Sequence, residues 1–293
     1  MALAQGGEAR RGKRGDRVGQ DGHGEEIAHH LALWGLTPVG PVRRTSTAWL
    51  APVRRGSERL MLKGVGTSDE AGQGAALAHW AGRGAVRLLA QHGEVLLLER
   101  AAPGGPLSSL VYAGRDDEAT AITAEVIATL HAAPTPEGFV TVEDWGRGFE
   151  RVRPRARAGG ADVRLIDRAA DLYRDLCASQ GAAKLLHGDL HHDNILHDEG
   201  RGWLAIDPKG VVGEAAFETG AMLRNPGPDP ALWADRARIA RRTAILCERL
   251  DLDLVRVVGW CFARAVLSAL WHVEDRQDPG PAWSMARATL SLL

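Results

Sequence analysis

Residues 185–210 read LLHGDLHHDNILHDEGRGWLAIDPKG, and this stretch decides how the whole chain is expected to fold. Three polar side chains, Asp189, Asn194 and Asp207, interrupt an otherwise apolar frame. Each can offer an oxygen atom to a divalent cation, because carboxylate and amide oxygens are hard ligands. The stretch is therefore the first candidate for a functional site.

A β-hairpin is expected in the second half of this stretch. Two short apolar runs, residues 195–196 and 203–206, flank the turn-forming residues 198–202. Asn194 comes directly before the first strand and Asp207 directly after the second. Because a hairpin begins and ends at the same edge, both side chains are expected at one end of it.

The spacing of these three residues matches what phosphoryl transfer requires. In the kinase template, a loop aspartate orients the acceptor hydroxyl and accepts its proton, and an asparagine five residues later binds Mg²⁺. A second aspartate, after a short hairpin, bridges Mg²⁺ to the phosphates. HGDLHHDN occupies the place of H-R-D-x-x-x-x-N, and IDP the place of D-F-G. The alternative, a metal-free loop whose His and Asp residues cap turns, leaves the ligand spacing unexplained.

The HGDLHxxN form followed by IDPK resembles the aminoglycoside phosphotransferase family, and more narrowly its streptomycin 6-phosphotransferase and hydroxyurea phosphotransferase group. The resemblance is sharp over residues 185–225, and LRNP at 223–226 also matches the group. It implies a protein-kinase-like α+β fold with a small antiparallel-sheet lobe, a larger, mostly helical lobe, and ATP and Mg²⁺ in the cleft. Asp189 is then the catalytic residue, and Asn194 and Asp207 are the metal ligands.

The same resemblance divides the chain into segments. Residues 1–24 are Gly-rich and charged, which predicts a disordered tail. Residues 25–98 are expected to form the N-terminal nucleotide-binding lobe. Gly and Pro cluster in residues 99–106, which indicates a hinge. Residues 107–293 are expected to form the helical lobe with the catalytic loop and the acceptor site.

The N-terminal lobe is expected to contain two hairpins. The predicted strands cover residues 46–51, 58–63, 85–89 and 94–99, with helices at 25–34 and 68–80. Lys63 ends the second strand, where the family has a lysine that binds the α- and β-phosphates; the alternative is an exposed strand-end lysine. Relatives pair this lysine with a helix glutamate, but here the candidates are Glu70 and Gln73. The backbone of Glu99 to Ala101 is expected to recognise adenine.

The helical lobe is expected to consist of amphipathic helices and one basic segment. The predicted helices cover residues 118–131, 163–177, 231–249, 254–274 and 281–292. Residues 145–160 are rich in Arg and Gly. This composition predicts a solvated segment, or alternatively a mobile lid near the phosphates.

Acidic residues after the catalytic stretch are candidates for an acceptor site. In relatives a D-P-K-G-x-x-G run leads to this site, and here Glu214 and Glu218 follow it; alternatively, both are helix N-terminal carboxylates favoured by the helix dipole. Trp271, Glu274 and Asp275 resemble the W-x-x-E-D run that closes the acceptor pocket in this group. A polycationic sugar needs acidic walls, because each cationic group loses hydration on entry. The alternative is that the last two carboxylates only solvate a helix end.

Composition narrows the setting in which the chain functions. The formal net charge of −1 over 293 residues gives no overall attraction to nucleic acid or a membrane surface. The three cysteines form no C-x-x-C pair, which disfavours a disulfide framework or a zinc site and fits a reducing compartment. No run of 18 apolar residues and no N-terminal signal core are present, so a cytoplasmic protein is expected.

These features predict an ATP-dependent O-phosphotransferase that acts on a small molecule. The favoured acceptor is a cationic aminoglycoside, streptomycin at its 6-hydroxyl, which implies antibiotic resistance; the alternative is hydroxyurea or another small hydroxylated metabolite. A nucleotide-binding, pseudokinase-like module is a second alternative, motivated by the missing helix glutamate and the absence of a G-x-G-x-x-G loop. A protein kinase is disfavoured, because no A-P-E-type segment follows Asp207.

Overall fold

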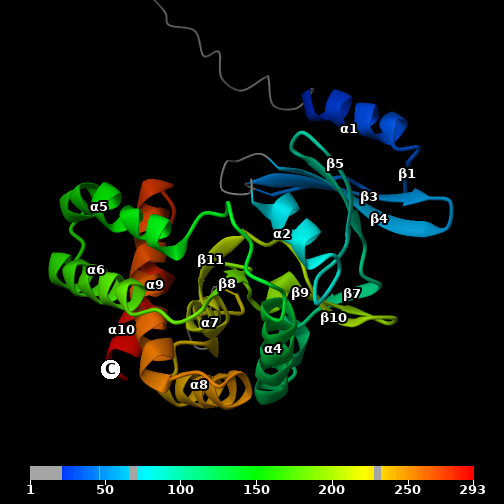
Figure 1. Cartoon of the computed structure of the whole chain (residues 1–293). Helices are drawn as coiled ribbons and strands as arrows, with labels where there is room; N and C mark the ends of the chain where they lie inside the picture. Colours follow the sequence, from blue (N-terminus) through cyan, green and yellow to red (C-terminus); the bar gives the residue numbers. More distant parts are fainter. Residues whose placement is uncertain (1–21, 46, 66–71, 228–231) are drawn as a thin grey trace, which may run out of the picture.

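A six-stranded antiparallel sheet forms the smaller lobe (Figure 1). The computed structural model describes residues 22–45, 47–65, 72–227 and 232–293. The strand order is β1-β3-β4-β6-β5, with β2 paired to β3. The strands are β1 (Thr37–Pro38), β2 (Arg43–Arg44), β3 (Ala48–Arg55), β4 (Glu58–Val65), β5 (Leu88–His92) and β6 (Val95–Glu99), and the helices of this lobe are α1 (Gly22–Leu33) and α2 (Gln73–Trp80).

The apolar run in β6 explains why this sheet is covered on both faces. Val95 and Leu97 belong to the cluster that packs under α1, whereas Leu96 and Leu98 belong to the cluster that contains α2. Side chains alternate across a strand, so four consecutive apolar residues supply both faces. Figure 1 shows α1 on the side of the sheet that faces away from the helical lobe.

The same alternation directs Lys63 toward the helical lobe. In β4, Leu60 and Leu62 lie in the cluster under α1, and Met61 packs with the opposite cluster. Lys63 is the next residue on the Met61 face and is only 3% exposed. The alternative prediction of an exposed strand-end lysine is therefore wrong.

The hairpin predicted from the sequence is present. A three-stranded sheet contains β7 (Pro103–Pro106), β9 (Ile195–Asp198) and β10 (Gly202–Ala205), and a separate pair contains β8 (Ala183–Leu186) and β11 (Val211–Glu214). The Ile206 N–H donates to the Asn194 carbonyl at 2.9 Å, which continues the β9–β10 ladder by one residue. Asn194 and Asp207 therefore meet at one end of the hairpin, as predicted.

The larger lobe is mostly helical and packs around α9. Its helices are α3 (Ser108–Tyr112), α4 (Asp116–His131), α5 (Val142–Ala158), α6 (Val163–Ala178), α7 (Ala215–Leu223), α8 (Arg236–Leu250), α9 (Leu254–Glu274) and α10 (Gly280–Leu290). α9 contacts α5, α6, α7, α8 and α10. Within the described ranges it is the one helix long and apolar enough to cross a membrane, but 78% of that stretch is buried inside the protein, as in a core helix.

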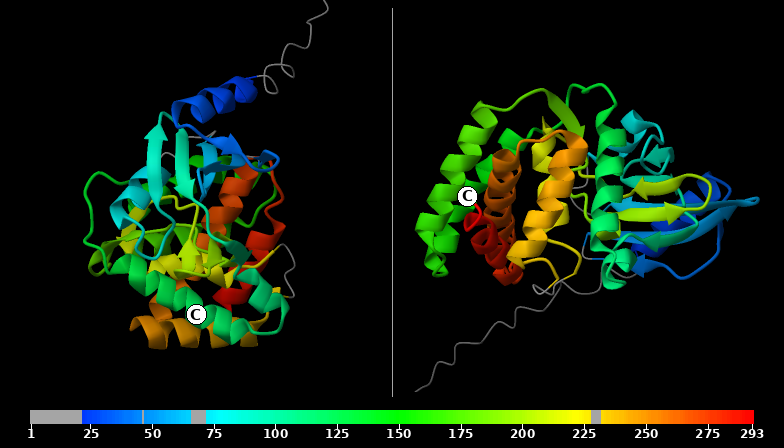
Figure 2. Two further views of the ribbon diagram at one scale, coloured as in Figure 1. Left: turned by 90° about the vertical axis from the view of Figure 1, so that its right-hand side faces the viewer. Right: turned by 90° about the horizontal axis from the view of Figure 1, so that it is seen from below.

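The two lobes lie side by side, and the β9–β10 hairpin lies where they meet (Figure 2). The predicted two-lobed α+β architecture is therefore confirmed. The predicted tail falls almost entirely outside the described residues, although α1 begins within it at Gly22. Glu70 also falls outside them. The domain boundaries at 98/99 and 106/107 stay a prediction.

Residues 145–160 were expected to be a solvated segment, and most of them form helix α5, on which Arg147, Arg151, Arg155 and Arg157 are exposed. Thr141 and Asp144 form a capping box, in which each side chain binds the backbone N–H of the other residue, and this starts the helix. Gly148 allows close packing on the other face: a Cβ atom there would lie 2.8 Å from the Leu267 side chain of α9. The arginines occupy the exposed face of an otherwise packed helix.

Two neighbouring ion pairs join α4 to α8 and differ mainly in burial. Arg242 is 0% exposed and binds the Asp116 carboxylate at 2.6–3.1 Å. Arg241 binds Asp117 at 2.8 Å, and both of these side chains are more than half exposed. Removing one partner of a buried pair leaves a buried charge without compensation, whereas an exposed pair contributes little.

We expect Asp116→Ala to lower the free energy of unfolding by about 3–5 kcal/mol. The matched substitution Asp117→Ala is expected to cost less than about 1 kcal/mol. Urea denaturation of the two variants measures the difference. Equal losses would show that burial does not decide the energy of these pairs.

Candidate active site

A cavity of about 730 Å³ lies between the sheet and the hairpin. Apolar side chains from both lobes contribute to its lining, among them Met61, Leu98, Leu196 and Ile206. Lys63, Glu99, Ala101 and Asp207 line the same cavity. The three residues expected to bind the nucleotide and one of the expected metal ligands therefore share one space.

Glu99 holds two strands together at the edge of this cavity. Its carboxylate accepts hydrogen bonds from the backbone N–H of Arg87 and from the Arg201 guanidinium, and its own N–H donates to the Arg87 carbonyl at 2.9 Å. The side chain is thus engaged within the protein. A contact to a bound base would fall on the backbone of this residue or of its neighbour Ala101, which is buried at the cavity wall.

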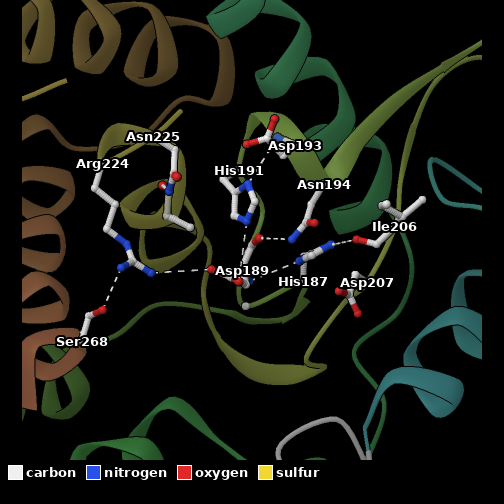
Figure 3. A network of polar contacts seen from close by, with 12 residues as sticks. His187, Asp189, His191, Asp193, Asn194, Ile206, Asp207, Arg224, Asn225 and Ser268 are labelled. Carbon is white, nitrogen blue, oxygen red and sulfur yellow. Dashed lines mark hydrogen bonds and ion pairs between the residues drawn. The ribbon is translucent and has the colours of Figure 1, made fainter. Parts of the chain in front are cut away.

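The loop 187–194 and the hairpin bring Asp189, Asn194 and Asp207 together (Figure 3). Asn194 Nδ2 donates to the Asp189 carbonyl at 3.0 Å. His187 Nε2–H donates to the Ile206 carbonyl at 2.7 Å, next to Asp207, and His187 Nδ1 accepts the Asp189 N–H at 3.2 Å. One buried imidazole therefore links the backbone of Asp189 to the carbonyl of Ile206, the residue before Asp207.

His187 is neutral in this arrangement. Burial lowers the pKa of its imidazole, and this effect exceeds the opposing influence of the Glu218, Asp189 and Asp207 carboxylates. The ring also stacks on Trp80 of α2, with centroids 6.4 Å apart. The sequence motif marks His187 as part of the loop, but its role as a link between loop, hairpin and α2 is visible only in the structure.

Glu218 supports the loop and does not face an acceptor. Its carboxylate accepts the backbone N–H groups of His187 at 2.5 Å and Gly188 at 3.0 Å, and the side chain is 0% exposed. Burial alone would raise the pKa of this carboxyl, but the neighbouring His131, 3.7 Å away, and the nearby charge of Arg264 outweigh it and lower the pKa. The predicted contact with substrate is therefore wrong, and the alternative of a carboxylate in the first turn of a helix is confirmed.

Glu214 is also engaged within the protein. Its carboxylate binds the Arg256 guanidinium at 2.5 and 2.6 Å and accepts the Trp260 indole N–H at 2.8 Å. It is the N-cap residue of α7. The expectation that Glu214 contacts substrate is therefore corrected in the same way: its carboxylate is already satisfied by α9.

Asp207 is bound by two side chains of the sheet lobe. Lys63 Nζ forms an ion pair with Asp207 Oδ1, and Gln73 Nε2 donates to the same oxygen at 2.7 Å. Burial alone would raise the pKa of Asp207, but the charge and hydrogen bond of Lys63, with the charge of Lys209, lower it. Gln73 occupies the position where relatives were expected to have a glutamate. Here its neutral amide donates a hydrogen bond to Asp207.

Asp189 presents an ionised carboxylate to a separate space. Its Oδ1 lies 3.6 Å from Arg224 Nη2, and its Oδ2 lies 3.9 Å from His191 Nε2. Burial alone would raise the pKa of Asp189, but the charges of His191, Arg224 and Arg264 outweigh it and lower the pKa. The carboxylate can therefore accept a hydrogen bond, and then a proton, from a hydroxyl group placed beside it.

Asn194 and Asp207 fit a magnesium ion by their chemistry. Mg²⁺ prefers oxygen ligands and is usually bound by one or two protein groups together with phosphates and water. Because Asn194 Nδ2 is engaged by the Asp189 carbonyl, its Oδ1 is the amide atom left for a cation. Within the described part of the chain, no group of three or more His, Cys, Asp or Glu side chains suits a metal ion. Nucleotide phosphates would therefore complete the coordination.

A second cavity, of about 510 Å³, includes Asp189 in its wall. Three of the residues expected to bind the acceptor, Trp271, Glu274 and Asp275, line it. Glu274 is bound there by Arg151 through two hydrogen bonds of 2.8 Å. The end of α9 thus contributes to a wall of the space next to Asp189.

Several residues of this second cavity received no role from the sequence. They are Asp144, Trp145, Arg224, Arg264, Ser268 and His272. Arg224 lies within the LRNP segment that matched the group. Arg264 is a charged residue in the middle of an apolar helix. Charged residues are rarely buried without a partner or a function, so an arginine within such an apolar run is a sequence signal that could have identified this position.

A family model described as aminoglycoside/hydroxyurea antibiotic resistance kinase matches residues 33–276. The chain belongs to this kinase family. Three relatives cover most of the kinase. Streptomycin 3''-kinase of Klebsiella pneumoniae is 33% identical over 84% of this chain and 91% of its own length. Hydroxyurea phosphotransferase of Kitasatospora aureofaciens is 35% identical over 91% of this chain and 78% of its own length. Streptomycin 6-kinase of Streptomyces glaucescens is 32% identical over 84% of this chain and 81% of its own length.

Solved structures confirm the kinase-like fold. Choline kinase LicA from Streptococcus pneumoniae superposes with a TM-score of 0.61 at 13% identity and covers 91% of this chain and 98% of its own. A thermostable mutant of aminoglycoside phosphotransferase APH(4)-Ia superposes with a TM-score of 0.63 at 15% identity and covers 90% of this chain and 97% of its own. At these identities the similarity concerns the fold alone.

Gln73 offers a test of how Asp207 is held. We expect Gln73→Glu to place a second carboxylate beside Asp207 and to remove a hydrogen bond to a charged group, which is worth about 1.5–3 kcal/mol. The expected result is at least a tenfold loss (about 1.4 kcal/mol) in kcat/KM for ATP, together with a lower unfolding temperature without nucleotide. The same substitution at exposed Gln91 is the control. A gain in activity would mean that Lys63, rather than Asp207, is the partner of this position.

Glu218 offers a test of the buried carboxylate. Its lowered pKa in the folded state means that its stabilisation is present above the unfolded value of 4.5 and is lost as the pH falls through the lower folded value. We expect Glu218→Gln to cost about 2–4 kcal/mol at pH 7, since an amide cannot accept both backbone N–H groups equally. The cost should shrink below pH 4.5, as urea denaturation at several pH values would measure. Glu150→Gln, on the exposed face of α5, should change little at any pH.

Proposed function

We propose that this kinase transfers the γ-phosphoryl group of ATP to a hydroxyl group of a small molecule. The observation that carries the proposal is that one loop and one hairpin hold Asp189, Asn194 and Asp207 between two cavities. One cavity has the apolar walls and the lysine that suit a nucleotide, and the other contains the Asp189 carboxylate. The two substrates would thus meet at these side chains.

The sheet lobe and the hairpin bind the nucleotide in this proposal. Lys63 aligns the phosphates, and Asn194 and Asp207 hold Mg²⁺ against them. The ion, when bound, neutralises the charge that develops on the phosphate oxygens. The close pair between Lys63 and Asp207 brings the phosphate-binding and metal-binding groups together before ligands enter.

Asp189 orients the acceptor hydroxyl and accepts its proton. Its lowered pKa makes it a weak base, which suffices when the transition state is loose and the proton is transferred late. Arg224 and His191 keep the carboxylate ionised and limit its rotation. Most of the rate enhancement then comes from positioning and charge neutralisation.

Streptomycin, at its 6-hydroxyl, is the first candidate acceptor. A cavity of about 510 Å³ suits a ligand of that size. Of the carboxylates in its wall, Arg151 binds Glu274 and Arg147 binds Asp144, so Asp275 is the first candidate for a cationic group. Hydroxyurea is the second candidate: donors of Arg224 and Arg264 near Asp189 suit its carbonyl oxygen. Relatives named for both activities support this pair of candidates.

An ADP-release assay with ATP and Mg²⁺ over streptomycin, other aminoglycosides and hydroxyurea tests the proposal. We expect turnover with one of these classes and a decrease of about 10²–10⁴-fold in kcat for Asp189→Asn, which keeps the shape but removes the base. Asp171→Ala, an exposed aspartate of α6, is the control and should behave as the wild type.

Phosphorus NMR of the product identifies which hydroxyl carries the phosphate. Nucleotide binding without transfer to any acceptor would contradict the proposal and favour a pseudokinase-like module. Near-native turnover by Asp189→Asn would show that the role given to Asp189 is wrong.

A further inference from the structure

The acceptor cavity has two ends of different chemical character. Its rim consists of partly or fully exposed residues, Asp144, Arg151, Glu274, Asp275 and Gln277. Its floor includes the buried Arg264 and Ser268 and the half-buried Asp189, Arg224 and His272. Carboxylates predominate at the rim, whereas guanidinium groups surround the one carboxylate of the floor.

Three buried nitrogen atoms of the floor have no hydrogen-bond partner among the described residues. They are Arg224 Nε, Arg264 Nε and His272 Nδ1. Other nitrogen atoms of the two arginines do form hydrogen bonds. Arg224 Nη1 donates to Ser268 Oγ at 2.7 Å, and Arg264 Nη1 donates to the Phe217 carbonyl at 3.2 Å. Buried polar atoms are nearly always paired, so these three nitrogens, in side chains that line one cavity, mark a wall whose polar groups the described residues leave unsatisfied.

The charges of the floor favour a ligand with acceptor oxygens. Arg264 is 3% exposed, and its pKa is lowered by burial and by the neighbouring Arg224 charge. The pKa of His272 is lowered for the same two reasons, so its ring is neutral and can donate one N–H. An ammonium group beside the reacting hydroxyl would face two guanidinium groups, whereas an oxygen atom there would accept their N–H groups.

We propose that Arg224 and His272 in the floor bind an oxygen atom of the acceptor. This oxygen is on the atom adjacent to the one that carries the reacting hydroxyl. The ligand class is a hydroxyl compound with a carbonyl, carboxylate or second hydroxyl on that neighbouring atom. This inference rests on the proposed function, because it takes the cavity as the acceptor site. Cationic groups of a larger acceptor then lie at the rim, so charge orients the acceptor in the cavity. Figure 3 shows Arg224 extended between Ser268 and Asp189, the position from which it would determine this specificity.

Three two-carbon alcohols provide a matched test. Glycolate, glycolamide and ethanolamine share a primary hydroxyl and differ in the neighbouring group, which is a carboxylate, a neutral carbonyl or an ammonium. Ligand-observed NMR titrations with the full chain measure their dissociation constants. We expect glycolate and glycolamide to bind at least about tenfold more tightly than ethanolamine, the size of a single charge-assisted hydrogen bond.

Substitutions at Arg224 connect the preference to the floor. Arg224→Met should remove the preference for glycolate over ethanolamine, and Arg224→Lys should retain part of it, since the charge remains but the planar fork is lost. Ser268→Ala should weaken it by releasing Arg224 Nη1. Arg174→Met, at an exposed arginine of α6, is the control and should leave all three constants unchanged. Unfolding temperatures verify that each variant is folded.

Two results would overturn the inference: ethanolamine binding as tightly as glycolate to the wild type, or an unchanged order of affinities in Arg224→Met. Because the measurement is of binding, it is separate from turnover. Absence of phosphoryl transfer to every acceptor would count against the proposed function and not against the charge preference. Transfer that persists while the preference is absent would count against this inference alone.

Discussion

The buried carboxylate of Glu218 is the interaction on which the site depends. It accepts the backbone N–H groups of His187 and Gly188 and so fixes the loop that carries Asp189. An ionised group in a protein interior is stable only when its oxygens find donors and positive charge, and here the loop backbone, His131 and Arg264 provide both. The loop conformation is therefore a consequence of α7 and α9, which pack beneath it.

His187 and Asp207 extend this constraint from the helical lobe to the sheet lobe. The His187 ring binds the end of the hairpin, and the hairpin places Asp207 against Lys63 and Gln73. The alternation of β4 turns the lysine inward, because the opposite face of the strand is occupied by apolar packing against α1. Contacts made by three separate elements thus converge on one aspartate, which couples the two lobes at the cavity proposed to bind the nucleotide.

The acceptor cavity is built differently, from α5, the end of α9 and the segment after α7. Its arginine floor and its more acidic rim come from residues far apart in the sequence, although Arg264 also donates to the Gly188 carbonyl of the loop. This separation explains how relatives named for streptomycin and for hydroxyurea share one fold. The two guanidinium groups near Asp189 lower the pKa of that carboxyl and also line the cavity proposed for the acceptor.

The sequence by itself determined the loop, the hairpin and the proximity of Asp189, Asn194 and Asp207, because strand pairing across a short turn is a local property. It also indicated most of the helices, although it did not show that the solvated segment at 145–160 is a helix, α5, with Gly148 packed on α9. Only the tertiary structure decided that Glu214 and Glu218 are engaged within the protein and that Arg224, Arg264 and His272 line a cavity. Whether a side chain points toward a cavity or toward the core depends on its partners in distant elements. The spacing of residues along the chain does not identify these partners.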